Sequence, residues 1–126
     1  MDNIKFNYIY RDAGNYKKWA GVVFSNPDRL TLGAIMNALV SSFLTDGLFI
    51  ALQIRIPEVF LSAEDGVTED DHCFHEFVAV ESTSKIPNDQ FCRSISEFTA
   101  EVTKEGKRGW QAFDPHDNPF HASLRA

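Results

Sequence analysis

The chain has 126 residues, a net charge of −6 at neutral pH and an isoelectric point of about 5.1. This length predicts one domain, residues 1–126, that is large enough to bury a hydrophobic core. Proteins that grip duplex nucleic acid generally present a basic surface, so the acidity argues against duplex DNA or RNA as a partner. A pocket for a small phosphorylated ligand remains compatible with this charge, because it needs only two or three Arg or Lys side chains.

The first residues and the two cysteines are typical of a protein of the reducing cytoplasm. Residues 1–10 lack the basic segment and apolar run of a signal peptide, and no apolar run approaches the roughly 18 residues of a membrane span. Cys73 and Cys92 do not form a CxxC motif. We therefore expect two free thiols, a reducing cytoplasm and no membrane partner.

The first elements predicted are a β-hairpin and a helix. Apolar residues alternate over 4–10 and predict a half-buried strand, which a turn at 11–15 connects to a second strand at 16–24. Apolar residues then recur at helical spacing over 32–44. Thr31 or Asp28 can cap the start of this helix, and Gly47 is expected to end it.

The next predicted elements are two strands. The apolar run 48–56, which Pro57 stops, predicts a central strand buried on both faces, with a short extension at 59–61. Residues 62–71 are expected to form a solvated acidic loop. Residues 72–81 alternate and predict a strand that carries His75 and Phe77 on one face and Val78 and Val80 on the other.

The last predicted elements are a second amphipathic helix and a tail. Four apolar residues mark the helix: Phe91, Ile95, Phe98 and Val102. Asn88 or Asp89 can cap it and Gly106 is expected to end it. The tail beyond carries Trp110, Phe113 and Phe120, which we expect to pack on the body or on a neighbouring subunit. This element order predicts an α+β fold, with an antiparallel or mixed sheet and two helices packed on one face.

The histidine-rich segment 71–76 invites a metal or a nucleophile interpretation. Each face of a strand here supplies at most two ligands, fewer than a zinc site needs, and His116 and His121 can complete a set only if the tail folds back. Cys73 and His75 lie on one strand face, but no motif for an oxyanion hole accompanies them. We therefore expect no metal, no cofactor and no catalytic residues.

The cationic and aromatic residues predict a phosphate-binding site. Arg55 lies in a strongly apolar run, where an Arg usually has an anionic partner. Arg forks suit phosphates, aromatic faces suit bases, and the amide of Asn88 can read a base edge. The cations at 104–108 also have an ordinary explanation, because they favour the dipole at a helix end. The expected ligand-binding residues are Arg11, Arg29, Arg55, Phe74, Phe77, Asn88, Lys107 and Arg108.

Three segments resemble a phage protein family. They are the run from Phe6 to Lys17 (FNYIYRDAGNYK), the segment from Val23 to Pro27 (VFSNP) with its following helix, and the segment from Asp71 to Phe77 (DHCFHEF). The family is the first-described type of Thoeris anti-defence protein, and the resemblance covers about the first two-thirds of the chain. It implies a phage-encoded molecular sponge in the host cytoplasm that binds a cyclic ADP-ribose isomer, glycosyl-cyclic ADP-ribose, without cleaving it.

The same resemblance implies a homo-oligomer, a dimer or a hexamer, with the ligand in pockets between two subunits and cyclic trinucleotides at separate sites. Two other functions stay open. One is a small hydrolase of nucleotide signals that uses Cys73, His75 and Glu76. The other is a phage protein that inhibits another protein, for which the acidic surface and the aromatic tail argue.

Overall fold

The computed structural model describes residues 2–11, 16–59 and 73–112. Residues 12–15 of the turn expected at 11–15, the acidic loop at 62–71, His72 and the tail aromatics Phe113 and Phe120 lie outside the described residues, as do His116 and His121, whereas Arg11 belongs to a strand. In the described part, no helix has the length and apolarity needed to cross a membrane.

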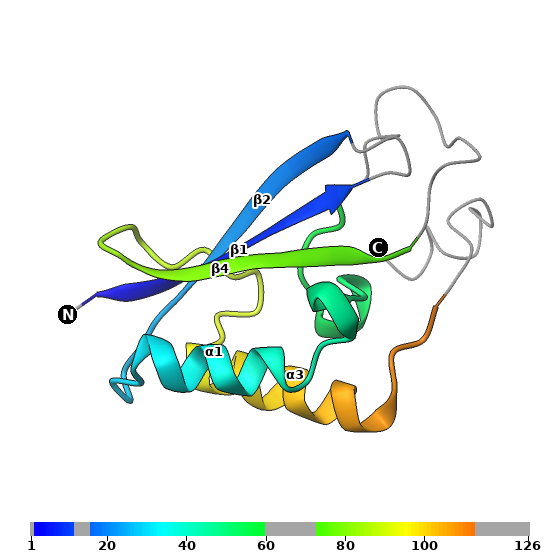
Figure 1. The fold of residues 1–126 in the computed structure, drawn as a ribbon. Coiled ribbons are helices and arrows are strands. Elements are labelled where there is room, and N and C mark those ends of the chain that lie inside the picture. Colours follow the sequence, from blue (N-terminus) through cyan, green and yellow to red (C-terminus); the bar gives the residue numbers. More distant parts are fainter. Residues whose placement is uncertain (1, 12–15, 60–72, 113–126) are drawn as a thin grey trace.

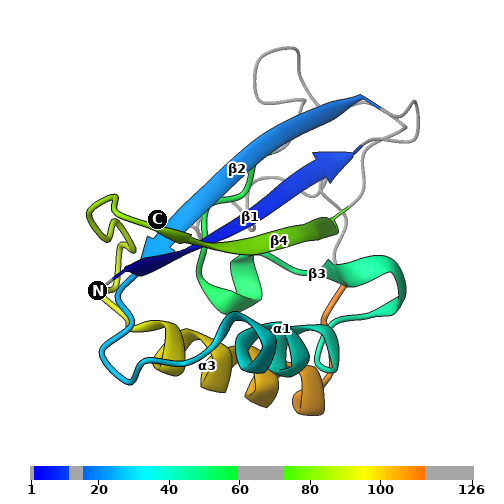
Figure 2. The same ribbon diagram turned by 60° about the vertical axis from the view of Figure 1, so that its left-hand side comes forward.

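The described chain forms a four-stranded sheet covered on one face by two helices (Figures 1 and 2). The strands are β1 (Asn3–Arg11), β2 (Lys17–Phe24), β3 (Leu48–Phe49) and β4 (His75–Thr83), in the order β2-β1-β4-β3, and every neighbouring pair is antiparallel. The helices are α1 (Leu32–Val40) and α3 (Ile95–Arg108). The α+β fold predicted from the sequence is confirmed, with an antiparallel sheet.

The core lies between the sheet and the helices and is largely aromatic. Phe6 on β1 is fully buried, and its ring contacts those of Phe43, Phe49 and Phe98 at centroid distances of 6.3, 5.8 and 5.1 Å. Phe98 also stacks on Phe24 at 4.3 Å. Much of the high aromatic content of this chain is therefore used to fill the space between the layers.

Helix α1 begins where the sequence predicts but ends earlier. Of the two capping candidates, Thr31 is the N-cap, and its hydroxyl accepts a hydrogen bond from the Ala34 amide at 3.1 Å. The helix ends at Val40 because the hydroxyls of Ser41 and Ser42 donate back to a helix carbonyl and compete with the ladder. The predicted extension to residue 44 is wrong, and Gly47 instead lies in a separate turn, η1 (Thr45–Gly47), with a φ of 74°.

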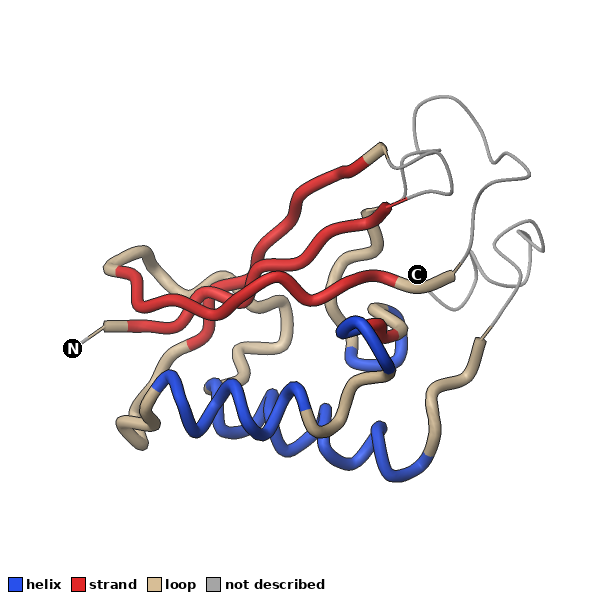
Figure 3. Tube along the Cα trace, in the orientation of Figure 1, coloured by secondary structure: helices blue, strands red, loops and turns tan. Residues whose placement is uncertain are grey.

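The prediction of a central strand at 48–56 is wrong. Only β3 is extended, and it is the edge strand of the sheet. A short 3-10 helix, η2 (Leu52–Ile54), follows it, so that this segment is mostly helix and loop in Figure 3. The apolar side chains are buried as expected, with Phe49 and Ile54 at 0% exposure. A continuous apolar run signals burial, but it does not distinguish a strand from a compact helical turn.

Strand β4 contains a bulge that changes which side chains face the core. Asn7 pairs with Ala79 but Tyr8 pairs with Phe77, so Val78 has no partner on β1. Phe77 and Val80 consequently both pack against the core. The strict alternation predicted for this strand, with these two residues on opposite faces, is therefore wrong, because a bulge shifts the alternation by one residue. The strand also begins at His75.

Helix α3 begins and ends later than predicted and has a different cap. Ser94 is the N-cap in a complete capping box with Glu97, so Asn88 and Asp89 are not the caps. Gly106 lies inside the helix, where a Cβ atom would come within 2.6 Å of the Ser42 carbonyl oxygen. The glycine thus permits a close crossing with the end of α1. Trp110 packs beside it on Phe43 and donates to the same carbonyl at 3.0 Å, as expected for the start of the tail.

Candidate functional site

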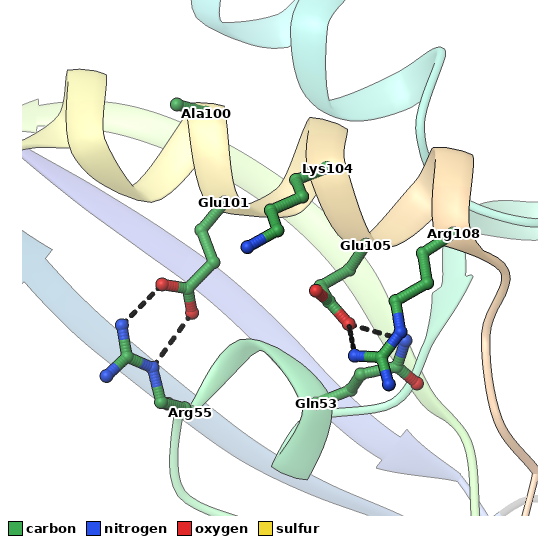
Figure 4. Close-up of a pocket in the computed structure, with 7 residues that line it drawn as sticks. All are labelled: Gln53, Arg55, Ala100, Glu101, Lys104, Glu105 and Arg108. Carbon is green, nitrogen blue, oxygen red and sulfur yellow. Dashed lines mark hydrogen bonds and ion pairs between the residues drawn. The ribbon is translucent and has the colours of Figure 1, made fainter.

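A groove lies between η2 and α3, with a volume of about 570 Å³ (Figure 4). Its lining residues are Gln53, Arg55, Ala100, Glu101, Lys104, Glu105 and Arg108. The α3 residues recur at intervals of three and four, which places them on one helix face. The groove therefore holds three cationic and two acidic side chains.

Arg55 forms one end of the groove. It follows η2 in the left-handed conformation, with φ 58° and ψ 44°. Its Nε and Nη2 donate to the carboxylate of Glu101, and its guanidinium lies 4.5 Å from the ring centroid of Phe91. The hydrogen bond that Arg55 donates to Glu101 raises the pKa of Arg55 above its usual value. The side chain is still 49% exposed, and its Nη1 donates to none of the described residues.

The opposite end of the groove is built around Glu105. This side chain is only 8% exposed and accepts from Gln53 Nε2 at 2.8 Å and from Arg108 Nη1 at 3.4 Å. Arg108 is 67% exposed, so most of its guanidinium faces solvent. Lys104 lies between the two pairs in Figure 4, and it forms no ion pair with a described residue. Cationic donors are thus available along the groove.

Arg93 is a buried counterpart of Arg55. Its five N–H groups are all used: two donate to Asp89, one to Glu101, and one each to the carbonyls of Ile54 and Arg55, at 2.9–3.0 Å. The side chain is 6% exposed. Burial alone would raise the pKa of Asp89, but hydrogen bonds from Arg93 outweigh it and hold that pKa below its usual range. Arg93 therefore holds the backbone at Ile54 and Arg55 in place.

The residues expected from the sequence to bind ligand do not all meet. Arg55 and Arg108 line the same groove, and Lys107 is exposed in the adjoining last turn of α3. Arg11 lies elsewhere, on β1, where it pairs with Glu76 at 3.1 Å.

The remaining four expected residues also lie apart from the groove. Phe77 stacks on Phe6 in the core at 5.4 Å. Asn88 exchanges hydrogen bonds with the backbone of Val23 and so borders β2. Arg29 has a φ of 55° and lines a separate hollow beside the start of α1, and Phe74 is partly exposed just before β4.

The Cys73 and His75 side chains lie in the interior. Cys73 is 3% exposed and His75 is 0% exposed, among the rings of Tyr8 and Tyr10. His75 Nε2 accepts from the Val59 amide at 3.0 Å, so this nitrogen is engaged in a structural contact. Over residues 2–11, 16–59 and 73–112, no group of three His, Cys, Asp or Glu side chains could hold a metal ion.

Several residues that line the groove or lie next to its lining residues were missed from the sequence. Glu101 and Glu105 share a face of α3 with the cations, a pattern that usually marks a solvated helix surface. Phe91 was assigned to a helix, whereas its ring lies beside Arg55. Nothing in the sequence distinguishes Gln53. The only sequence feature that indicates an ion pair between Asp89 and Arg93 is their opposite charge at a spacing of four residues.

Comparison of the chain with protein-family models, curated proteins and solved structures found no match. Arginine forks, a lysine and an exposed aromatic ring are the groups that bind phosphates and stack on bases. The described groove, in an α+β domain, thus has groups suited to a small anionic ligand.

Proposed function

We propose that this chain is a non-catalytic binding protein that captures and sequesters a cyclic ADP-ribose-type immune signal, glycosyl-cyclic ADP-ribose. By withholding this signal in the host cytoplasm, a phage-encoded sponge blocks bacterial anti-phage defence. The observation that carries the proposal is the groove in which Arg55, Lys104 and Arg108 lie together with N–H groups that face solvent.

The ligand and the groove match in their chemistry. A cyclic ADP-ribose carries two phosphates and an adenine, which require cationic donors and an aromatic face. Arg55 and Arg108 supply bidentate donors at opposite ends of the groove, and the ring of Phe91 is 46% exposed beside Arg55. The resemblance of three segments in the first two-thirds of the chain to the Thoeris anti-defence family supports the same ligand class.

The functional unit in this proposal is a homo-oligomer, a dimer or a hexamer. The groove is open to solvent, which leaves one side of a bound ligand for residues of a second subunit. Cyclic trinucleotides are further candidate ligands at separate sites. Sequestration requires binding in the nanomolar range, about 12 kcal/mol, and contacts from two subunits would help to supply it.

A hydrolase that uses Cys73 and His75 is less well supported, because both side chains are buried. An inhibitor of another protein is favoured by one observation. Helix α1 carries no charged residue, and three of its apolar side chains face solvent one turn apart: Leu32, Met36 and Val40. Affinity capture from host lysate with the wild-type chain and with Met36→Glu tests this alternative; a partner that the wild type retains and the variant loses supports it.

The sponge proposal is tested by capture and release. The purified chain is incubated with glycosyl-cyclic ADP-ribose, separated from free ligand by filtration and heated, and the released ligand is identified by mass spectrometry. Recovery of intact ligand is expected. A chain that retains no ligand before heating contradicts the proposal, and release of a cleaved product identifies the hydrolase instead.

A variant pair links the capture to the groove. Arg55→Ala with Arg108→Ala removes two groove cations, whereas Lys17→Ala with Lys85→Ala removes two exposed cations elsewhere and changes the net charge equally. We expect the first pair to lose retention and the second to keep it. Equal retention by both pairs would place the binding site outside the groove.

A further inference from the structure

Glu101 is shared by two arginines that differ in burial. Its Oε2 accepts from Arg93 Nη1 at 3.0 Å and from Arg55 Nε at 3.0 Å. Arg93 is 6% exposed and all its donors are used, whereas Arg55 is 49% exposed. If Arg55 turns away, the carboxylate still keeps a charge-assisted hydrogen bond from Arg93.

The two arginines therefore differ in what it costs to move them. Moving Arg93 would leave Asp89 buried without its cation, and the loss of one partner from a buried pair is strongly destabilising. Moving Arg55 breaks an exposed pair, and exposed pairs contribute little because water and salt screen them. Arg55 is consequently the arginine that can leave Glu101.

We propose that Glu101 is an internal counter-ion that Arg55 exchanges for a phosphate of the ligand, while Arg93 keeps the released carboxylate neutralised. The inference rests on the proposed function, because it describes the same groove. It also predicts which anions the groove prefers. Until a ligand arrives, Glu101 holds the Nε and Nη2 donors of Arg55, so an anion that takes these two donors must replace a carboxylate that is already bound.

The exchange favours ligands with two linked phosphates. A single phosphate that replaces Glu101 at Arg55 exchanges one anion for another and gains little. A pyrophosphate extends further along the groove toward Lys104, which forms no ion pair with a described residue and lies beyond Glu101 in Figure 4. The groove therefore selects for the diphosphate unit rather than for a lone phosphate.

The test uses inorganic pyrophosphate and inorganic phosphate in calorimetric titrations. Wild-type protein should bind pyrophosphate more tightly than phosphate. Glu101→Gln should bind both anions roughly five- to tenfold more tightly than wild type, because Arg55 no longer has a charged competitor. Glu81→Gln is the matched control, since it removes an exposed carboxylate from β4 with the same change in net charge, and its affinities should equal those of wild type.

Unchanged or weaker pyrophosphate binding by a folded Glu101→Gln protein would overturn the exchange, as would an equal gain in Glu81→Gln. If the variant does not fold, wild-type protein gives the answer by nitrogen-15 spectra of the arginine Nε–H groups, assigned with Arg55→Lys. Pyrophosphate should shift the Arg55 signal and leave the Arg93 signal in place. Movement of Arg93, or of neither arginine, contradicts the inference.

The outcomes also separate this inference from the proposed function. Tighter pyrophosphate binding by Glu101→Gln, together with no capture of glycosyl-cyclic ADP-ribose by wild type, would retain the exchange and reject the sponge. Capture of the signal with no effect of Glu101→Gln on pyrophosphate would retain the sponge and reject the exchange.

Discussion

Arg55 and Arg93 both bind the carboxylate of Glu101, and they differ in burial and in the use of their donors. Arg93 is buried, uses all its N–H groups within the chain, and joins η2 and the loop before α3 to that helix. Arg55 is half exposed, and part of its guanidinium faces the groove. Two arginines on one carboxylate can therefore differ in how many of their donors the chain itself uses, and residue type alone does not reveal this difference.

The largest effect should follow from removal of the buried arginine. Arg93→Met leaves Asp89 as an uncompensated buried charge, so we expect the free energy of unfolding to fall by about 3–5 kcal/mol. Urea denaturation measures this loss. The double variant Arg93→Met with Asp89→Asn should be less destabilised than the single one, because no unpaired carboxylate remains. If the single variant loses less than about 1 kcal/mol, the Arg93–Asp89 pair contributes no more to stability than an exposed ion pair, which would contradict its structural role.

A pair of glycines tests the helix crossing that supports the groove. Gly106→Ala places a Cβ atom against the Ser42 carbonyl, at 2.6 Å before relaxation, and should destabilise the protein by about 1–3 kcal/mol. Gly33→Ala, in the exposed first turn of α1 with no atom within 4 Å of the new Cβ, should stabilise it by about 0.5–1 kcal/mol. Thermal unfolding of the two variants measures both. Equal shifts of the same sign would contradict the close crossing.

Acid should weaken the buried arginine pair. The pKa of Asp89 is lower in the folded chain than its usual value, so its contribution is complete above the unfolded pKa of about 4. The contribution is lost as the pH falls through the lower, folded-state pKa. Denaturation at pH 6 and pH 3 should therefore show a smaller loss of stability in Asp89→Asn than in wild type. An identical pH dependence in the two proteins would show that Asp89 does not couple folding to protons.

The smallest effect on stability should come from the exposed arginine. Arg55→Ala removes a pair that is half exposed, and we expect a change of less than about 1 kcal/mol in the free energy of unfolding. The same urea titration used for Arg93→Met provides the measurement. A loss of several kcal/mol would mean that Arg55 is structural, and it would remove the contrast between the two arginines.

Much of the fold could be predicted from the sequence, because it depends on periodic apolar residues. The first hairpin, the start of α1 and the packing of both helices on one face follow from such patterns. The segment 48–56 was wrongly predicted as a central strand, because a continuous apolar run is equally compatible with several buried structures. The bulge at Val78 could not be predicted either, because it inserts one residue into an alternation that the sequence pattern presents as regular.

The site was less predictable, because it depends on pairs that are distant in the sequence. The sequence correctly suggests that Arg55 has an anionic partner, but that partner is Glu101, 46 residues away. Phe77 and Asn88 are chemically suitable for a nucleotide, yet one fills the core and the other binds the backbone of β2. Composition names the groups that can bind a ligand, whereas tertiary structure determines which of them are already engaged.

The central claim is that the groove holds glycosyl-cyclic ADP-ribose, and calorimetric titration with this compound tests it most directly. Wild-type protein and the Lys17→Ala/Lys85→Ala control should bind it with equal affinity in the nanomolar range. Arg55→Ala/Arg108→Ala should bind at least roughly a hundredfold more weakly, since two charge-assisted phosphate contacts are lost. Affinity equal to wild type in the groove variant, or no heat of binding in any of the three proteins, would contradict the account.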